Sequence, residues 1–187
     1  MLWKERVVLF RSFWIFPILA AFLVWVTYRW QAETQVRDLL WLIPLGVALW
    51  TLLEYFLHRF VFHFEVENKS IGRLLNGSHL EHHAQPRDAH HLLVHTSYGL
   101  VISAIVYILL FAALRDSFRA AGLLVGIWAG FLYYESVHYR VHLGNSPGAL
   151  IGYQRRAHFH HHFRAPDVSF GVTTPFWDYV FGSKRHD

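Results

Sequence analysis

Histidine is the residue type in this sequence with the clearest capacity for chemistry. The 187 residues include 15 histidines and no cysteine. Without cysteine, a disulfide framework, a thiolate zinc site, an iron–sulfur cluster and a cysteine nucleophile are all excluded. A bound metal must therefore take nitrogen and oxygen ligands, and imidazole nitrogen suits zinc, copper, iron and nickel rather than magnesium or calcium.

Ten of the histidines fall into four clusters whose spacing suits metal binding. In HLEHH and HFHHH three imidazoles project from one helical turn, and HYRVH carries a pair four residues apart on one helix face. The pair in HRFVFH is five apart, about 140° off a common α-helical face, so we expect a curling helix end to turn it inward. The ten residues are His58, His63, His79, His82, His83, His138, His142, His158, His161 and His162.

The number of clustered imidazoles indicates how many ions could be bound. One histidine pair at helical spacing is weak evidence, because such pairs are common on ordinary helix surfaces. Ten imidazoles exceed one coordination sphere, so two ions with about five ligands each are expected. The other five histidines fall outside these patterns and have no predicted role; they are His90, His91, His95, His160 and His186.

Three of the carboxylates near these clusters are the main candidates to orient a ligand ring. Glu54 precedes His58 by four residues, Glu135 precedes His138 by three, and Asp88 follows HLEHH. Each is a candidate to accept a ring N–H from a ligand and so fix its tautomer. Glu54 and Glu135 could instead be metal ligands or ordinary interfacial charges.

The elements that must position the histidines are predicted to be membrane helices. The chain is 54% hydrophobic and only 16% charged, well below the charged content of soluble domains. Apolar stretches at about 12–28, 39–57, 97–114 and 120–139 are each near the ~20 residues that cross a bilayer. They lack the polar face of a soluble bundle. We expect an all-α integral membrane protein, one domain over 1–187, with four transmembrane helices, the first a retained anchor.

The distribution of Lys and Arg predicts the orientation of these helices. With four spans, one side of the membrane carries only Arg29, Arg37, Arg115 and Arg119, which leaves 13 of the 17 basic residues on the other side. The positive-inside rule places that richer side, with both chain ends and every histidine, in the cytoplasm. The clusters would then form a cytoplasmic helical cap that holds a di-metal centre. The net charge of +4 is explained by this bias, and no nucleic-acid partner is expected.

The four motifs in order, followed by FGVTTPFWDYVFG, resemble those of the fatty acid hydroxylase/sterol desaturase superfamily of integral-membrane di-metal oxidases. The sequence is most similar to the fatty acid 2-hydroxylase branch, over about residues 54–183. By this likeness one ion would be bound by His58, His63, His79, His83 and His161. The other would be bound by His82, His138, His142, His158 and His162.

The resemblance implies a catalytic di-metal centre of two Fe ions that uses O₂ to hydroxylate a lipid taken from the bilayer. The expected reaction is 2-hydroxylation of a fatty acyl chain, free or in a ceramide-type amide. Zinc can occupy the sites in isolated protein, because it binds above ferrous iron in the Irving–Williams order. Electrons would come from an external donor of the cytochrome b5, ferredoxin or flavoprotein type.

Two other functions stay open from the sequence. A sterol or carotenoid hydroxylase or desaturase of the same superfamily would use the same metals on a different lipid. A membrane metal-binding or transport protein is disfavoured, because transport needs polar ligands inside the spans and the stretch 97–114 offers none. The membrane would be a bacterial inner membrane or the endoplasmic reticulum.

Overall fold

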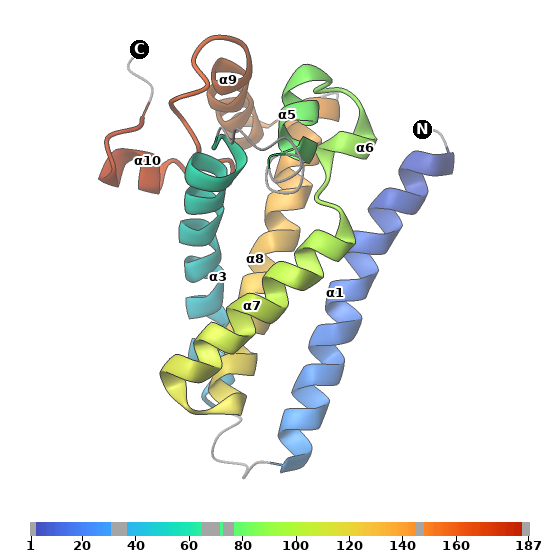
Figure 1. The fold of residues 1–187 in the computed structure, drawn as a ribbon, viewed down its shortest axis with the longest axis vertical. Coiled ribbons are helices and arrows are strands. Elements are labelled where there is room, and N and C mark those ends of the chain that lie inside the picture. Colours follow the sequence, from blue (N-terminus) through green and yellow to red (C-terminus); the bar gives the residue numbers. More distant parts are fainter. Residues whose placement is uncertain (1–2, 31–36, 65–71, 73–76, 145–147, 185–187) are drawn as a thin grey trace. The chain divides into compact units, whose positions relative to one another are not determined.

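Every regular element in the described part of the chain is a helix, as the all-α prediction requires (Figure 1). The computed structural model describes residues 3–30, 37–64, 72, 77–144 and 148–184. In chain order the elements are α1 (Trp3–Trp30), α3 (Leu39–Phe56), the π-helix η1 (Leu57–Phe62), α5 (Gly77–Ala84), α6 (Ala89–Leu92), α7 (Thr96–Leu114), α8 (Ser117–Leu143), α9 (Ala149–Phe163) and α10 (Phe176–Val180).

Three helical segments are long and apolar enough to cross a membrane, namely Leu39–Phe62, Thr96–Leu114 and Ser117–Leu143. They match the predicted stretches at 39–57, 97–114 and 120–139. The predicted stretch at 12–28 lies in α1, whose apolar part Phe13–Val26 is shorter. The chain is therefore a membrane protein with three candidate spans among the residues described.

The chain divides into two compact units. One combines Met1–Trp50 with Val94–Leu132, and the other combines Thr51–Leu93 with Tyr133–Asp187. Helices α3 and α8 each begin in the first unit and end in the second. The ten clustered histidines all belong to the second unit.

A stripe of glycines on α8 sets the closest helix contact of the first unit. Gly122, Gly126 and Gly130 are spaced four apart, so they share one face, and that face meets α3. A Cβ atom added at Gly126 would lie 2.2 Å from the Ile43 carbonyl oxygen, and one added at Gly46 would lie 2.8 Å from the Gly126 Cα. Small residues at this spacing let two membrane helices approach until their backbones touch.

Aromatic rings fill the remaining core of the first unit. Phe16 of α1 is buried, with its ring centroid 5.1 Å from that of Phe131 and 5.7 Å from that of Trp128. The Trp128 indole N–H donates to the Ser103 hydroxyl of α7 at 2.8 Å. No residue of α7 is buried, so this helix presents its apolar side chains outward, as a lipid-facing helix does.

We predict that Gly126→Ala destabilises the protein, because the new methyl group has no room against the α3 backbone. Overpacking of this kind costs about 1–3 kcal/mol, which lowers the melting temperature by about 2–4 °C per kcal/mol in a chain of this size. Thermal unfolding in detergent measures the change.

The matched control is Gly152→Ala on α9, where an added Cβ meets only the Arg156 Nη1 atom, at 3.9 Å. Alanine favours a helix over glycine by about 1 kcal/mol, so this melting temperature should hold or rise. Equal behaviour of the two variants would contradict the close approach of α3 and α8.

Candidate metal centre

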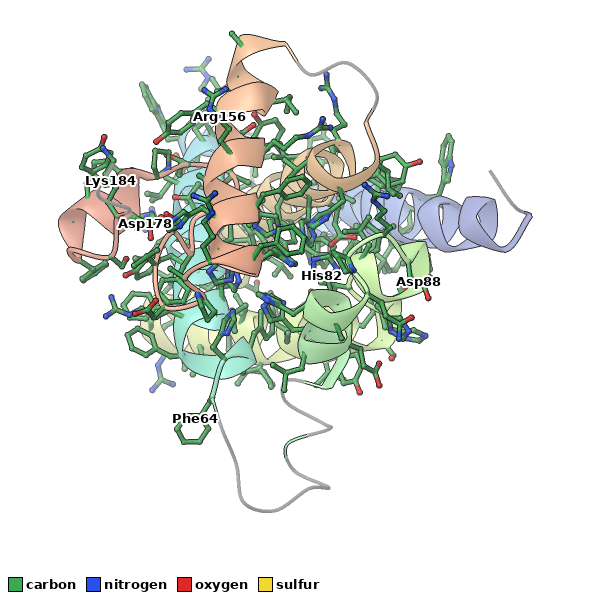
Figure 2. All side chains as sticks on the ribbon, turned by 90° about the horizontal axis from the view of Figure 1, so that it is seen from above. Phe64, His82, Asp88, Arg156, Asp178 and Lys184 are labelled. Atoms are coloured by element: carbon green, nitrogen blue, oxygen red, sulfur yellow. The ribbon has the colours of Figure 1, made fainter. Side chains whose placement is uncertain are left out.

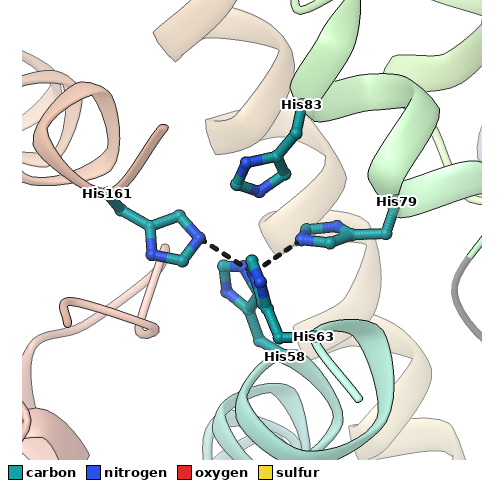
Figure 3. Close-up of side chains that lie close together, drawn as sticks. All are labelled: His58, His63, His79, His83 and His161. Atoms are coloured by element: carbon teal, nitrogen blue, oxygen red, sulfur yellow. Dashed lines mark hydrogen bonds between the residues drawn. The ribbon is translucent and has the colours of Figure 1, made fainter. Parts of the chain in front are cut away.

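The second unit gathers the ten histidines into two groups of five. In each group, one potential ligand atom per residue lies within 4.8 Å of the others. The first histidine group, whose rings face a common centre in Figure 3, is His58, His63, His79, His83 and His161. The second histidine group is His82, His138, His142, His158 and His162. The structure thus brings together all ten predicted residues, in the two sets that the family resemblance implies.

Two helices supply ligands to both groups. On α5, His79 and His83 are four apart and face the first group, while His82 faces the second. On α9, His161 faces the first group, while His158 and His162, again four apart, face the second. A helix between the groups can supply both. Residues four apart lie close to one helix face and reach the same group, whereas adjacent residues lie about 100° apart and reach different groups.

The pair in HRFVFH reaches the first group through a π-helix. In an α-helix His58 and His63 would project on different sides, which is why a curling helix end is expected from the sequence. The chain instead forms η1 over Leu57–Phe62, with His63 as its C-cap. Hydrogen bonds in a π-helix run to the fifth residue, so residues five apart come near a common face. The wider turn is the physical reason why this spacing works.

The Nε2 atoms of the first group converge at distances that suit a shared cation. His63 Nε2 lies 3.1 Å from the Nε2 atoms of both His79 and His161 (dashed in Figure 3). One ring proton can bridge only one of these two contacts. Two nitrogens bound at about 2.1 Å to one ion, at right angles, lie about 3.0 Å apart. The observed distances are compatible with ligands around a shared metal.

The second group shows the same convergence around His158. Its Nε2 atom lies 3.0 Å from that of His138, 2.9 Å from that of His142 and 3.0 Å from that of His162. The Nε2 atoms of His138 and His82 are 3.1 Å apart. A single proton on His158 cannot serve three neighbours, so this group also fits a bound cation.

Burial keeps the imidazoles in the neutral form that binds metals. Burial, together with a smaller effect of neighbouring histidines, lowers the pKa of His83 to about 4 and that of His161 to about 3. The pKa of His82 falls to about 2 for the same reasons. At neutral pH these rings therefore offer lone pairs rather than charged N–H groups.

Rings of the two histidine groups contact each other directly. The rings of His83 and His162, one from each group, stack with centroids 4.0 Å apart and planes 8° from parallel. His158 and His161 also stack across the boundary, with centroids 6.0 Å apart. Two ions held by these groups would be neighbours that could act on one substrate atom.

Backbone carbonyls, rather than carboxylates, accept the outer ring N–H groups of two ligands in the first group. His58 Nδ1 lies 2.5 Å from the Phe170 carbonyl oxygen, and His161 Nδ1 lies 2.8 Å from that of Val168. With Nδ1–H donated outward, the Nε2 lone pair of each ring faces the group. Glu54, expected to accept from His58, instead accepts the backbone N–H groups of Val172 and Thr173.

The other two predicted carboxylates differ in burial. Glu135 is fully buried on α8, one turn before His138. Asp88 is partly exposed, and its carboxylate lies 3.7 Å from His91 Nε2. Asp88 therefore contacts a histidine outside both groups.

Three of the five remaining histidines have described side chains, and these lie outside the two groups. His91 Nδ1 is 3.1 Å from Glu81, and His95 caps α7 by accepting from the Ser97 backbone N–H. His160 lies on α9 between ligands of the two groups. The side chain of His90 and all of His186 lie outside the described residues.

Two residues that hold the site in place were not singled out from the sequence. Asp178 is 1% exposed and accepts backbone N–H groups from Phe170 and Gly171, both at 2.9 Å. Arg155 donates from Nε to the Val141 carbonyl and from Nη2 to the Arg140 carbonyl, both at 2.8 Å. It thereby ties α9 to the end of α8. The only sequence signal for Asp178 was its place in the FGVTTPFWDYVFG tail.

Comparison with known proteins places this geometry in context. The family model for fatty acid hydroxylase matches residues 43–183. Dihydroceramide fatty acyl 2-hydroxylase FAH2 of Arabidopsis thaliana is 33% identical over 145 residues, 76% of this chain and 60% of the relative. Ceramide very long chain fatty acid hydroxylase SCS7 of Saccharomyces cerevisiae is 32% identical over 181 residues, 92% of this chain and 45% of the relative.

A solved structure shows the same fold. It is described as full length scs7p with only the hydroxylase domain visible, and it is 28% identical with a TM-score of 0.77. The match covers 92% of this chain and 66% of that one. The chain thus spans less than two thirds of the length of these relatives.

We predict that the metal-free protein loses stability as the pH falls below about 6.5. The pKa values of His83 and His161 are lowered in the folded state, so the unfolded chain binds protons that the folded chain does not. Each such imidazole costs about 1.4 kcal/mol per pH unit, between its unfolded and folded pKa. Melting temperatures of chelator-treated protein between pH 7.5 and pH 4.5 test this, and a flat profile would contradict it.

Proposed function

Because the chain belongs to the fatty acid hydroxylase family, we propose that it is a membrane-bound lipid hydroxylase that acts at carbon 2 of a fatty acyl chain. The acyl chain is free or forms part of a ceramide-type amide, in line with the names of the Arabidopsis and yeast relatives. The observation that carries the proposal is the pair of adjacent five-histidine groups. Ten converging imidazoles suit two transition-metal ions, and iron is among the metals that imidazole binds.

The proposed cofactor is a pair of iron ions, one held by each histidine group. When bound, such ions supply the activation of O₂ and the oxidation of an unreactive C–H bond. Imidazole nitrogen binds iron and zinc alike, and zinc ranks higher in affinity, so isolated protein is expected to carry some zinc. The residues of the chain hold the ligand rings neutral and oriented.

The reaction also requires electrons. Insertion of one oxygen atom of O₂ into a C–H bond reduces the other oxygen atom to water, which consumes two electrons and two protons. We propose that they come from an external donor of the cytochrome b5, ferredoxin or flavoprotein type. Nucleic acid has no place in this scheme.

The proposed membrane arrangement adds α1 as a fourth span and treats residues 1–187 as one functional domain. Its support is the bias of Lys and Arg, which favours cytoplasmic chain ends and a cytoplasmic metal site. The second unit carries both histidine groups, so the reactive carbon would be oxidised at the cytoplasmic face. The membrane is a bacterial inner membrane or the endoplasmic reticulum.

We predict that expression of the protein with a suitable electron donor yields acyl lipids heavier by one oxygen, hydroxylated at carbon 2. Mass spectrometry of lipid extracts, with fragmentation to locate the hydroxyl group, measures this. The matched control is the His162→Ala variant, which should form little or no product. Change confined to sterols or carotenoids would favour the alternative members of the superfamily.

We also predict that the purified protein binds about two metal ions per chain and that His162→Ala loses one of them. Loss of a ligand should weaken binding at its site by more than the roughly 10–100-fold typical of outer-shell changes. The control is His160→Ala, two positions away on α9 and outside both groups, which should keep both ions. Variable stoichiometry in the unmodified protein would favour a metal-binding or transport role.

A further inference from the structure

A short segment of the C-terminal tail contacts the first histidine group through backbone carbonyls and through the ring of Phe170, which packs edge-on against the rings of His58 and His161. We call residues 168–173 the strap. The carbonyl of Val168 accepts the ring N–H of His161, and that of Phe170 accepts the ring N–H of His58. Two of the five rings in this group are therefore oriented by the position of the strap.

The strap is held by two buried carboxylates. Asp178 accepts the backbone N–H groups of Phe170 and Gly171, one on each carboxylate oxygen, at 2.9 Å. Glu54 accepts those of Val172 at 2.7 Å and Thr173 at 2.9 Å. Four successive backbone N–H groups are thus donated to buried carboxyl oxygens.

Both carboxylates are anchored to the elements that carry the ligands. Glu54 is 4% exposed and lies on α3, one helical turn before His58. It therefore fixes the strap to the same helical segment that carries this ring. Asp178 lies on α10, whose Trp177 indole N–H donates to the Thr51 hydroxyl of α3 at 2.9 Å.

A further relay of hydrogen bonds holds Asp178 in place. Arg59 donates to the Tyr55 hydroxyl, Tyr55 lies 2.7 Å from the Ser183 hydroxyl, and Ser183 donates to Asp178 Oδ1 at 2.9 Å. In Figure 2, Asp178 lies on one side of His82 and Asp88 on the other. None of these contacts joins Asp178 to a ring nitrogen of either histidine group. Its effect on a bound metal would therefore be indirect and would pass through the strap.

The backbone of the strap adopts an unfavourable conformation at Ser169. Ser169 has a φ of 58°, a conformation that costs a non-glycine residue of order 1 kcal/mol or more. At Gly171 an added Cβ would lie 2.1 Å from the Thr174 carbonyl oxygen. The hydrogen bonds to Asp178 and Glu54 stabilise this strained path.

Four of the five rings in the second histidine group lack such a carbonyl acceptor among the residues that the structure describes. The Nδ1 atoms of four of its members are buried and have no hydrogen-bond partner there; they belong to His82, His138, His158 and His162. The two groups therefore differ in how their rings are oriented, although each has five imidazoles.

We propose that Glu54 and Asp178 are positioning residues that act through the strap, and that they support metal binding by the first histidine group but not by the second. Each carboxylate holds backbone N–H groups of the strap, the strap carbonyls hold the ring N–H groups of His58 and His161, and those rings present Nε2 to the ion. The inference rests on the proposed metal ligation by the two groups. It adds that the ions differ in their dependence on the C-terminal segment.

The experiment compares metal binding by Asp178→Asn and Asp167→Asn, with Co²⁺ alone as the probe and the full chain in detergent. Asparagine keeps the size of Asp178 but sets an NH₂ group against a backbone N–H. We expect one of two Co²⁺ ions to bind about 10–100-fold more weakly, the range typical of outer-shell changes. Asp167 is exposed in the same tail, so its variant should match the unmodified protein. Retention of both ions at full affinity in Asp178→Asn would overturn the proposal.

Double variants identify which ion is weakened. Combined with His162→Ala, which disables the second group, Asp178→Asn should leave no tight site. Combined with His83→Ala, which disables the first group, it should remove nothing further, because contributions within one site do not add. A merely structural role would weaken both ions alike in these combinations, and that outcome would also overturn the proposal.

Glu54→Leu provides a second measurement and replaces the first if Asp178→Asn does not fold, because leucine removes the Oε1 atom that accepts both the Val172 and the Thr173 N–H groups. Its expected result is the same selective loss of one ion. The failure of this inference is distinct from that of the proposed function. If the unmodified protein binds no stoichiometric metal, the proposed function fails, whereas two ions retained in both carboxylate variants overturn only the role of the strap.

Discussion

The crowding of neutral nitrogen lone pairs is the constraint on which the rest of this structure depends. Nε2 atoms lie 2.9–3.1 Å apart within each histidine group, and ring protons are too few to bridge all these contacts. A cation bound between the rings would relieve this crowding. The protein must therefore bring ten rings together before metal binding can offset the free-energy cost of crowding them. Its helices and hydrogen bonds are arranged to lower that free-energy cost.

Different parts of the chain orient the histidine rings of the two groups. In the second group, ligands come in pairs four apart on α8 and α9, and Arg155 bonds these helices to each other. In the first group, the ligands come from η1, α5 and α9, and the strap adds carbonyl acceptors behind two of them. Helix regularity orients one group, whereas an irregular segment held by buried carboxylates orients much of the other.

The sequence predicted the local features well, because these follow from periodicity. HLEHH and HFHHH do lie on helices, and the long apolar stretches match three candidate spans. The π-helix was missed, since a single sequence gives no signal that separates a π-turn from a curling α-helix end. The strap was missed because carbonyl acceptors carry no side-chain signature and Glu54 meets Val172 across 118 positions. The glycine stripe of α8 was visible as a repeat every four residues but acquires meaning only opposite α3.

The sharing of α5 and α9 between the two groups has a consequence for how the chain can change in length. One residue inserted between His79 and His82 would rotate the remainder of α5 by about 100° and would misdirect ligands of both groups at once. The same holds between His158 and His161 on α9. Insertions and deletions are therefore expected to be tolerated only outside these two turns. On α5 and α9, the ligand spacing of one histidine group therefore cannot change without changing that of the other.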